Sequence, residues 1–247
     1  MITQTSSPLL KMFDLEFLVW VIIDVVLFFT LLFLIFIIRL LLAEDYPDKI
    51  EPLDLSTIQT GDIIGAAYRR SHGYFVSFWS ASIWSHIGIA WRDPVNQELF
   101  ILEAAVYKDP QYRGILKVPI LDWVRFNRKG YMGITRLRRE KNVPPIDPVQ
   151  MMKTFQDLQK IKIDSFNWRW VRLLFRTPYT PERQTHYTCY ELSVLMLQEM
   201  GIVEKRHRCS SYFPGDIMSG NMEFAPGYSV DPIVFVDTTD YYRVIKG

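Results

Sequence analysis

Cys189 and His86 are side chains with reactive chemistry, and both lie in segments that predict ordered local structure. Cys189 lies in HYTCYELSVLML, where Thr188 and Glu191 have the T-x-x-E spacing of a capping box, so a helix is expected to begin at Cys189. The first turn of a helix has free backbone N–H groups and the positive end of the helix dipole, which favour a reactive thiolate. The pattern therefore predicts a candidate nucleophile at a helix N-terminus.

His86 is expected on one strand of a hairpin. The runs SHIGIAW and ELFILEA are rich in β-branched and aromatic residues, and the turn-prone RDPVNQ separates them. If Trp91 pairs with Glu98, His86 lies directly opposite Glu103, with Cβ atoms about 5 Å apart. A carboxylate beside an imidazole orients the ring and stabilises the imidazolium. The two side chains share a face unless the register shifts by an odd number of residues. We therefore predict that Cys189, His86 and Glu103 act together.

A structural role for the same cysteine stays open. Free cysteines are among the most buried residue types, so Cys189 taken alone is more often a packing residue than a nucleophile. Cys209, in RHRCSSYF, has no comparable helix start and is expected to be structural. The remaining histidines are expected in loops: His72, His186 and His207.

The order of short motifs along the chain resembles a known family. GDII, SHIGI, ILEA, YTCYEL and YFPGDI follow one another within residues 55–219. This order is similar to that of the permuted papain-like amidases, the YiiX type of the NlpC-like cysteine hydrolase superfamily, in which the histidine precedes the cysteine. The resemblance implies Cys189 as nucleophile, His86 as base and Glu103 as the polar third member. Tyr190 departs from the pattern, because a small residue often follows the nucleophile, and its ring is large enough to crowd the site.

The resemblance implies an α+β fold, a circularly permuted papain/NlpC-like domain whose antiparallel sheet packs on the nucleophile helix. It also implies a cysteine hydrolase that cleaves an amide or ester through a thioester. The related lecithin:retinol acyltransferase-like proteins share the permuted layout, so a lipid acyltransferase or phospholipase stays open. A catalytically inactive, membrane-tethered scaffold is the third alternative. The backbone N–H of Cys189 is expected to supply one oxyanion donor, and the sequence does not identify a second.

An apolar segment near the N-terminus predicts a membrane-spanning helix. Residues 18–38 are an apolar run interrupted only by Asp24 and Thr30, and about 20 such residues span the hydrocarbon core. A cleaved signal peptide has a shorter apolar region, of about 7–15 residues, behind a basic start. A single-pass anchor is therefore the favoured interpretation. More basic residues follow the segment than precede it, which favours a cytosolic C-terminal domain.

Composition argues against several other classes of protein. The 247 residues carry a formal net charge of +1 without a long basic run, so nucleic acid is not an expected partner. The four histidines are scattered and no Cys-x-x-Cys occurs, so no metal or other cofactor is expected. Two cysteines and no N-x-Ser/Thr sequon give no sign of a disulfide-built, glycosylated ectodomain. The expected partners are the bilayer and a substrate with an amide or ester bond, with lipid as one alternative.

The predicted organisation is an N-terminal tail (1–16), a transmembrane anchor (17–42), a linker (43–54) and the permuted papain-like domain (55–247). Besides the hairpin, strands are expected at 61–67, 112–118, 131–137, 228–237 and 240–245. Helices are expected at 119–126, with Leu121 and Val124 at helical spacing, and at 148–161 and 189–200. Two aromatic-rich segments, 74–84 and 166–175, are expected in the core, with the lining of an acyl-sized cleft or contact with the bilayer interface as the functional alternative.

Overall fold

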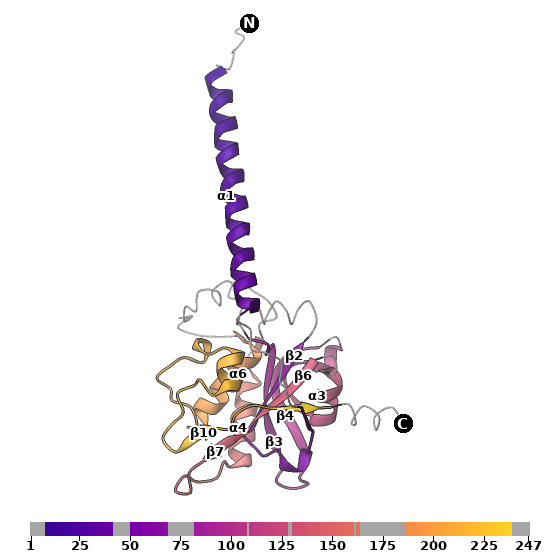
Figure 1. Ribbon diagram of the computed structural model, residues 1–247. Coiled ribbons are helices and arrows are strands. Elements are labelled where there is room, and N and C mark those ends of the chain that lie inside the picture. Colours follow the sequence, from indigo (N-terminus) through magenta and orange to yellow (C-terminus); the bar gives the residue numbers. More distant parts are fainter. Residues whose placement is uncertain are drawn as a thin grey trace. The chain divides into compact units, whose positions relative to one another are not determined.

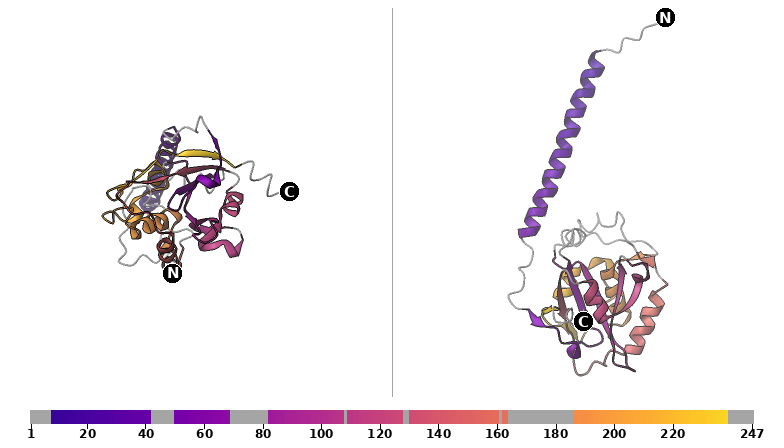
Figure 2. Two further views of the ribbon diagram at one scale, coloured as in Figure 1. Left: turned by 90° about the horizontal axis from the view of Figure 1, so that it is seen from below. Right: turned by 90° about the vertical axis from the view of Figure 1, so that its right-hand side faces the viewer.

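The computed structural model describes residues 8–41, 50–68, 82–107, 109–127, 130–160, 162–163 and 186–238. The chain divides into two units, Met1–Ala43 and Glu44–Gly247. Figures 1 and 2 show the helices and strands of both. The aromatic segment 166–175, the strand expected at 240–245 and most of the segment 74–84 lie outside the described residues.

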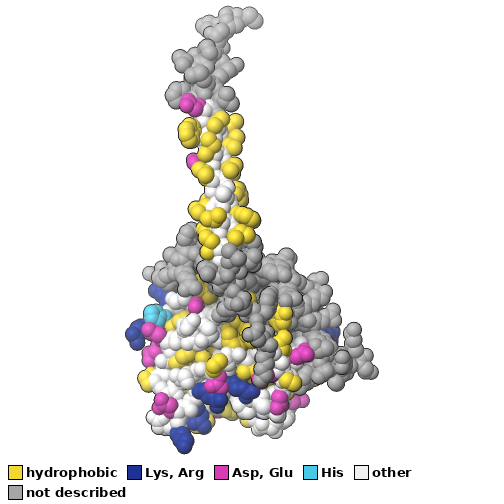
Figure 3. Space-filling model, viewed as in Figure 1, with side chains coloured by type: hydrophobic (Ala, Val, Ile, Leu, Met, Phe, Trp, Pro, Cys, Tyr) yellow, Lys and Arg dark blue, Asp and Glu magenta, His cyan; other side chains and the backbone are white. Residues whose placement is uncertain are grey.

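The first unit is a single long helix, α1 (Pro8–Leu41). Its stretch Glu16–Ile35 has a mean hydropathy of 2.9 and is not buried in the structure. Figure 3 shows hydrophobic side chains along this helix. At 1.5 Å per residue, its 20 residues extend for about 30 Å, the thickness of the hydrocarbon core. The helix is therefore long and apolar enough to cross a membrane, a property that a signal sequence near the N-terminus shares.

The second unit is built on a seven-stranded sheet with the strand order β1-β11-β6-β2-β3-β4-β5. All neighbouring strands run antiparallel except β1 and β11, which are parallel. The strands of this sheet are β1 (Glu51–Pro52), β2 (Ile63–Tyr68), β3 (His86–Arg92), β4 (Leu99–Val106), β5 (Arg113–Pro119), β6 (Gly130–Thr135) and β11 (Val234–Asp237).

The described part of this unit also contains two small sheets and several helices. The small sheets pair β10 (Tyr228–Val230) with β7 (Leu137–Arg139), and β8 (Lys162–Ile163) with β9 (His186–Tyr187). The helices are α3 (Ile120–Phe126), α4 (Pro148–Leu158), α6 (Cys189–Glu199) and α7 (Pro214–Ser219), with 3-10 turns η1 (Leu55–Thr57), η2 (Pro110–Tyr112) and η3 (Cys209–Ser211). The described chain is thus of mixed α+β class.

Alternate side chains of the strands enter two separate hydrophobic cores, as the two-residue period of a strand requires. On β3, Ile87 and Ile89 join the core that contains Leu192 of α6. Ala90 joins the other core, which contains Trp123 of α3. Helices α4 and α6 therefore cover one face of the sheet and α3 the other, an arrangement that Figure 1 shows.

Two of the expected strands are interrupted. The strand expected at 131–137 divides at Arg136, whose guanidinium donates to the carbonyl oxygen of Thr57 at 2.8 Å and to its hydroxyl at 2.9 Å. The strand expected at 228–237 divides into β10 and β11 around Pro232, which has no N–H for a ladder. These breaks let β7 and β10 pair with each other outside the main sheet.

The register of β3 and β4 differs from the expected one. Trp91 pairs with Phe100, not with Glu98, so the predicted register was wrong by two residues. The loop decides this, because the N–H of Asp93 donates to the carbonyl oxygen of Glu98 at 2.8 Å and closes the hairpin there. Inside the loop, Gln97 adopts a φ of 63°.

An even shift in register keeps both side chains on one face of the sheet. The pairs run from Ile89 opposite Leu102 to Arg92 opposite Leu99, and in this register His86 and Glu103 are diagonal neighbours instead of direct partners. A Cβ atom added to Gly88 would lie only 2.3 Å from the Cγ2 atom of Ile101. A side chain at position 88 would therefore clash with Ile101.

Candidate active site

Cys189 is the first residue of α6, and its side chain is partly exposed. Thr188 is the N-cap: its hydroxyl accepts from the N–H of Glu191, and its own N–H donates to Glu191 Oε2 at 2.8 Å. The predicted capping box is therefore present. The hydroxyl of Ser193 donates to the carbonyl oxygen of Cys189 at 2.9 Å, which further fixes the first turn. The cap orders the backbone at Cys189 and leaves its N–H outside the helical ladder.

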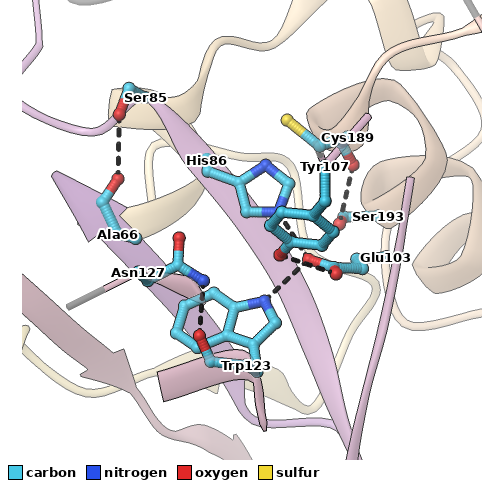
Figure 4. A network of polar contacts seen from close by, with 9 residues as sticks. All are labelled: Ala66, Ser85, His86, Glu103, Tyr107, Trp123, Asn127, Cys189 and Ser193. Carbon is cyan, nitrogen blue, oxygen red and sulfur yellow. Dashed lines mark hydrogen bonds and ion pairs between the residues drawn. The ribbon is translucent and has the colours of Figure 1, made fainter. Parts of the chain in front are cut away.

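His86 and Glu103 form the central contact of the site. His86 Nε2 lies 2.5 Å from Glu103 Oε2, and the Glu103 carboxylate is fully buried. His86 is the first residue of β3 and only 8% exposed. Figure 4 shows the imidazole ring between the Cys189 sulfur and the Glu103 carboxylate. The structure thus brings together the three residues that the sequence analysis selected.

Electrostatics favour a charged imidazole at this position. Burial alone would lower the pKa of His86, but the charge of Cys189, the charge of Glu103 and hydrogen bonds with both side chains outweigh it. Together these contacts raise the pKa of His86 from 6.5 to about 10. Because Nε2 faces Glu103, Nδ1 is the nitrogen available to Cys189. A protonated imidazole beside a thiolate is the resting form that cysteine nucleophiles use.

Two further donors surround the Glu103 carboxylate. Trp123 Nε1 donates to Oε2 at 2.6 Å, and the hydroxyl of Tyr107 donates to Oε1 at 2.8 Å. Sequence reasoning missed both residues. For Tyr107 a signal was present, because it directly follows β4, four positions after Glu103, and an even spacing along an extended chain places two side chains on the same face. For Trp123 none was present, because it belongs to another element, 20 positions away.

Helix α3 holds Trp123 in place. It begins after Pro119, and Trp123 is fully buried in it. The side-chain amide of Asn127 donates to the carbonyl oxygen of Trp123 at 2.7 Å and closes the end of the helix. Phe126 packs on Tyr107 with ring centroids 4.5 Å apart. The same short helix therefore supplies one donor to Glu103 and supports the other.

The other candidate residues lie away from this contact or outside the described chain. Cys209 is buried, and burial raises the pKa of its thiol to about 12, which suits the structural role expected for it. The Tyr190 ring is buried in the core, stacked on Phe213 at 6.4 Å. His186 lies in β9, so the expectation of a loop there was wrong. His72 lies outside the described residues.

His207 has an acidic partner that sequence reasoning did not assign to it. Its Nε2 lies 3.2 Å from Glu223 Oε1, and both side chains are substantially exposed. Within the described part of the chain, no cluster of three or more His, Cys, Asp or Glu side chains is arranged to hold a metal ion.

Comparisons with known proteins give distant similarity among solved structures alone. Neither a family model nor a curated protein matches the chain. Among solved structures, the chain is similar to the crystal structure of metalloprotein yiiX from Escherichia coli O157:H7, with 16% sequence identity and a TM-score of 0.43. The match covers 70% of this chain and 96% of that one. A similarity this distant assigns neither an activity nor a metal to the present chain.

Proposed function

We propose that the chain is a cysteine hydrolase of the permuted papain-like type, acting on an amide or ester. Cys189 is the nucleophile, His86 the base and Glu103 the residue that orients the imidazole. The observation that carries this proposal is the position of His86, between a buried carboxylate and a thiol at a helix start. The chain order supports the permuted layout, because the strand with His86 precedes the helix with Cys189.

The reaction proceeds through a thioester. His86 Nδ1 takes the proton of Cys189, and the thiolate attacks the carbonyl carbon of the substrate. The N–H of Cys189 donates to the resulting oxyanion. The intermediate then expels an amine or alcohol, which takes the proton from the imidazolium. In the second half, His86 accepts a proton from water, hydroxide attacks the thioester carbon, and the departing sulfur recovers that proton as the carboxylic acid leaves.

A lipid substrate is the second candidate, and α1 is the observation that favours it. Its apolar stretch Glu16–Ile35 is long enough to anchor the protein as a single-pass membrane protein. The basic residues after this stretch favour a cytosolic position for the C-terminal unit. An enzyme anchored in this way meets acyl esters of the same bilayer at high local concentration, so acyl transfer or phospholipid hydrolysis uses the same three residues.

The test of the proposal is the rate of Cys189 alkylation by iodoacetamide as a function of pH. The full-length protein in detergent micelles carries Cys209→Ala, so that Cys189 is the one thiol whose alkylation is measured. A second variant that also carries His86→Ala is compared with it. We expect rapid alkylation at neutral pH that becomes slow without His86, because the imidazolium stabilises the thiolate. An unreactive thiol, or one indifferent to His86, contradicts an enzyme and favours a membrane-tethered scaffold.

The substrate is then distinguished by two assays on the same preparation. One follows cleavage of peptide amides, and the other follows acyl loss from phospholipid vesicles. Cys189→Ala is the control in both, because turnover that survives this substitution does not come from the proposed nucleophile. Cleavage of peptides alone removes the lipid candidate, and acyl loss from vesicles alone removes the amidase.

A further inference from the structure

We propose that Trp123 is a positioning residue that keeps a proton on Nε2 of His86 and thereby leaves Nδ1 to serve Cys189. The role of Nδ1 rests on the proposed function, whereas the position of the proton follows from the geometry around Glu103 alone. The indole donates to the same carboxylate oxygen that His86 faces, at 2.6 Å. Figure 4 shows this arrangement.

The donors around Glu103 decide where the proton lies. An indole N–H donates and never accepts, so Glu103 Oε2 must accept from Trp123. A proton on Oε2 would point toward one of two neighbours. Pointing it at the indole N–H would bring two donors together, so it would have to point at Nε2 of the imidazole. His86 Nε2 lies 2.5 Å from the same oxygen. The hydrogen bond from Trp123 stabilises the ionised carboxylate and makes Oε2 a weaker base, so the hydrogen between Oε2 and Nε2 is held on the nitrogen.

Tyr107 does not impose this direction. Its hydroxyl lies 2.8 Å from Oε1, the oxygen that does not face His86. A hydroxyl either donates or accepts, so it satisfies Oε1 whether or not that oxygen carries a proton. Even with a proton on Oε1, Oε2 still accepts from Trp123 and from His86. Tyr107→Phe is therefore the matched control, since it removes one donor from Glu103 without releasing the proton on Nε2.

The indole is held firmly enough to act in this way. Trp123 is fully buried, and its ring lies nearly parallel to that of His86, at an angle of 24° with centroids 6.2 Å apart. Asn127 fixes the backbone of Trp123 from the end of α3. Phenylalanine at position 123 keeps an aromatic ring beside His86 and removes the N–H, so Trp123→Phe isolates the hydrogen bond.

Among the residues that the structure describes, few other charged groups lie on the elements that pack around the carboxylate. His86 belongs to β3, Tyr107 directly follows β4, and Cys189 of α6 acts on the carboxylate through His86. The charged residues of the remaining elements have partners of their own. On α3, Asp122 pairs with Arg125. On β5, Lys117 lies over the rings of Trp91 and Phe100, and Arg113 donates to the carbonyl oxygen of Tyr107. Beside η2, Asp109 accepts from the side chain of Gln111.

The experiment reads which imidazole nitrogen carries the proton. The full-length protein, labelled with ¹⁵N-histidine in detergent micelles, carries Cys189→Ala so that His86 titrates without the thiolate. His86→Ala assigns the signal among the four histidines. At pH values above the pKa of His86, the neutral imidazole of the Cys189→Ala protein is expected to keep its proton on Nε2. The same is expected of the protein that also carries Tyr107→Phe. Adding Trp123→Phe is expected to give a mixture of the Nδ1–H and Nε2–H forms.

The second readout is the alkylation of Cys189 by iodoacetamide in the Cys209→Ala background. We expect Trp123→Phe to slow alkylation about tenfold and to move the low-pH limit of reactivity upward, because the imidazolium loses part of its support. Tyr107→Phe is expected to slow it by less than about threefold.

If the ¹⁵N signals show that the Trp123→Phe protein keeps the proton of His86 on Nε2, the inference is overturned, whatever the alkylation rates are. Alkylation that is indifferent to His86→Ala contradicts the proposed function instead, and the position of the proton is still decided by the ¹⁵N signals. Should Trp123→Phe fail to fold, the indole N–H signal of Trp123 in the Cys189→Ala protein takes its place. That signal is expected to shift as His86 titrates, and an unchanged signal refutes the inference.

Discussion

The chain contains two described histidine–glutamate pairs, and they differ in almost everything except residue type. His86 and Glu103 are buried and 2.5 Å apart, and the carboxylate accepts from two further donors. His207 and Glu223 are 3.2 Å apart, and their side chains are 47% and 41% exposed. Glu223 also faces Arg206 at 3.4 Å.

The effect of a histidine–glutamate pair on pKa and stability therefore depends on its surroundings more than on the two residues themselves. Water screens the exposed pair, and ion pairs of that kind contribute about 0–1 kcal/mol to stability. The buried pair lies in a medium where charges interact strongly, so each donor on Glu103 matters and the pKa of His86 rises to about 10. The exposed pair is therefore a natural control for the buried one.

The largest expected contrast comes from removing each histidine. His86→Ala should slow the alkylation of Cys189 at neutral pH by about 100-fold or more, because a positioned base contributes about 10²–10⁴-fold. His207→Ala should leave the rate within about twofold. Both variants are compared in the Cys209→Ala background by mass spectrometry. Equal effects of the two substitutions would show that the buried pair has no special part in thiol reactivity.

Glutamine in place of each glutamate should give a smaller contrast, visible in both stability and reactivity. An amide side chain at position 103 could accept from Trp123 and His86 through its oxygen and donate to the Tyr107 hydroxyl through its NH₂ group, so the main loss is the negative charge that strengthens these hydrogen bonds. We expect Glu103→Gln to lower the free energy of unfolding by about 2 kcal/mol and to slow alkylation about tenfold. Glu223→Gln should change stability by less than about 0.5 kcal/mol. Thermal melting in detergent measures the change in stability. A Glu103→Gln protein with unchanged stability and unchanged alkylation would contradict the description of the buried carboxylate.

The mildest change is a shift in the titration of His86. Its pKa of about 10 in the folded protein exceeds its ordinary value of 6.5, so the folded state holds an additional proton between these two pH values. The stability that this proton adds is complete below pH 6.5 and is lost as the pH rises toward 10. Cys189→Ala removes the largest raising cause and should lower the pKa of His86 and narrow this window. The NMR titration of His86 checks the shift, with the signal of His207 expected to stay unchanged.

Features determined by near neighbours in the chain were predictable. The capping box joins Thr188 to Glu191, three positions away, and the structure contains it as expected. Helix α4 buries Met151 and Phe155, as their four-residue spacing indicates. Helix α3 was expected from the sequence, but its buried face was only partly identified: Val124 is buried, whereas Leu121 is 39% exposed. Seven residues are too few for periodicity to define a face, so packing on the sheet decides it.

The candidate site was predictable in its members and not in its geometry. The register of β3 and β4 was wrong by two residues, yet His86 and Glu103 meet because an even shift preserves the face. Their catalytic roles stay a prediction. The donors on Glu103 were missed for different reasons: the even spacing of Tyr107 was visible in the sequence, whereas the contact with Trp123 depends on how α3 lies against β4.

Three features could be read from the amino-acid sequence: the long apolar helix, the helix start at Cys189 and the shared face of His86 and Glu103. Each follows from interactions within a few residues or from the period of a strand, which no distant contact needs to supply. The tertiary structure alone decided the hairpin register, the burial of Glu103 and the meeting of its carboxylate with Trp123. These depend on packing between elements distant in the chain, and local patterns carry no information on where one element comes to rest against another.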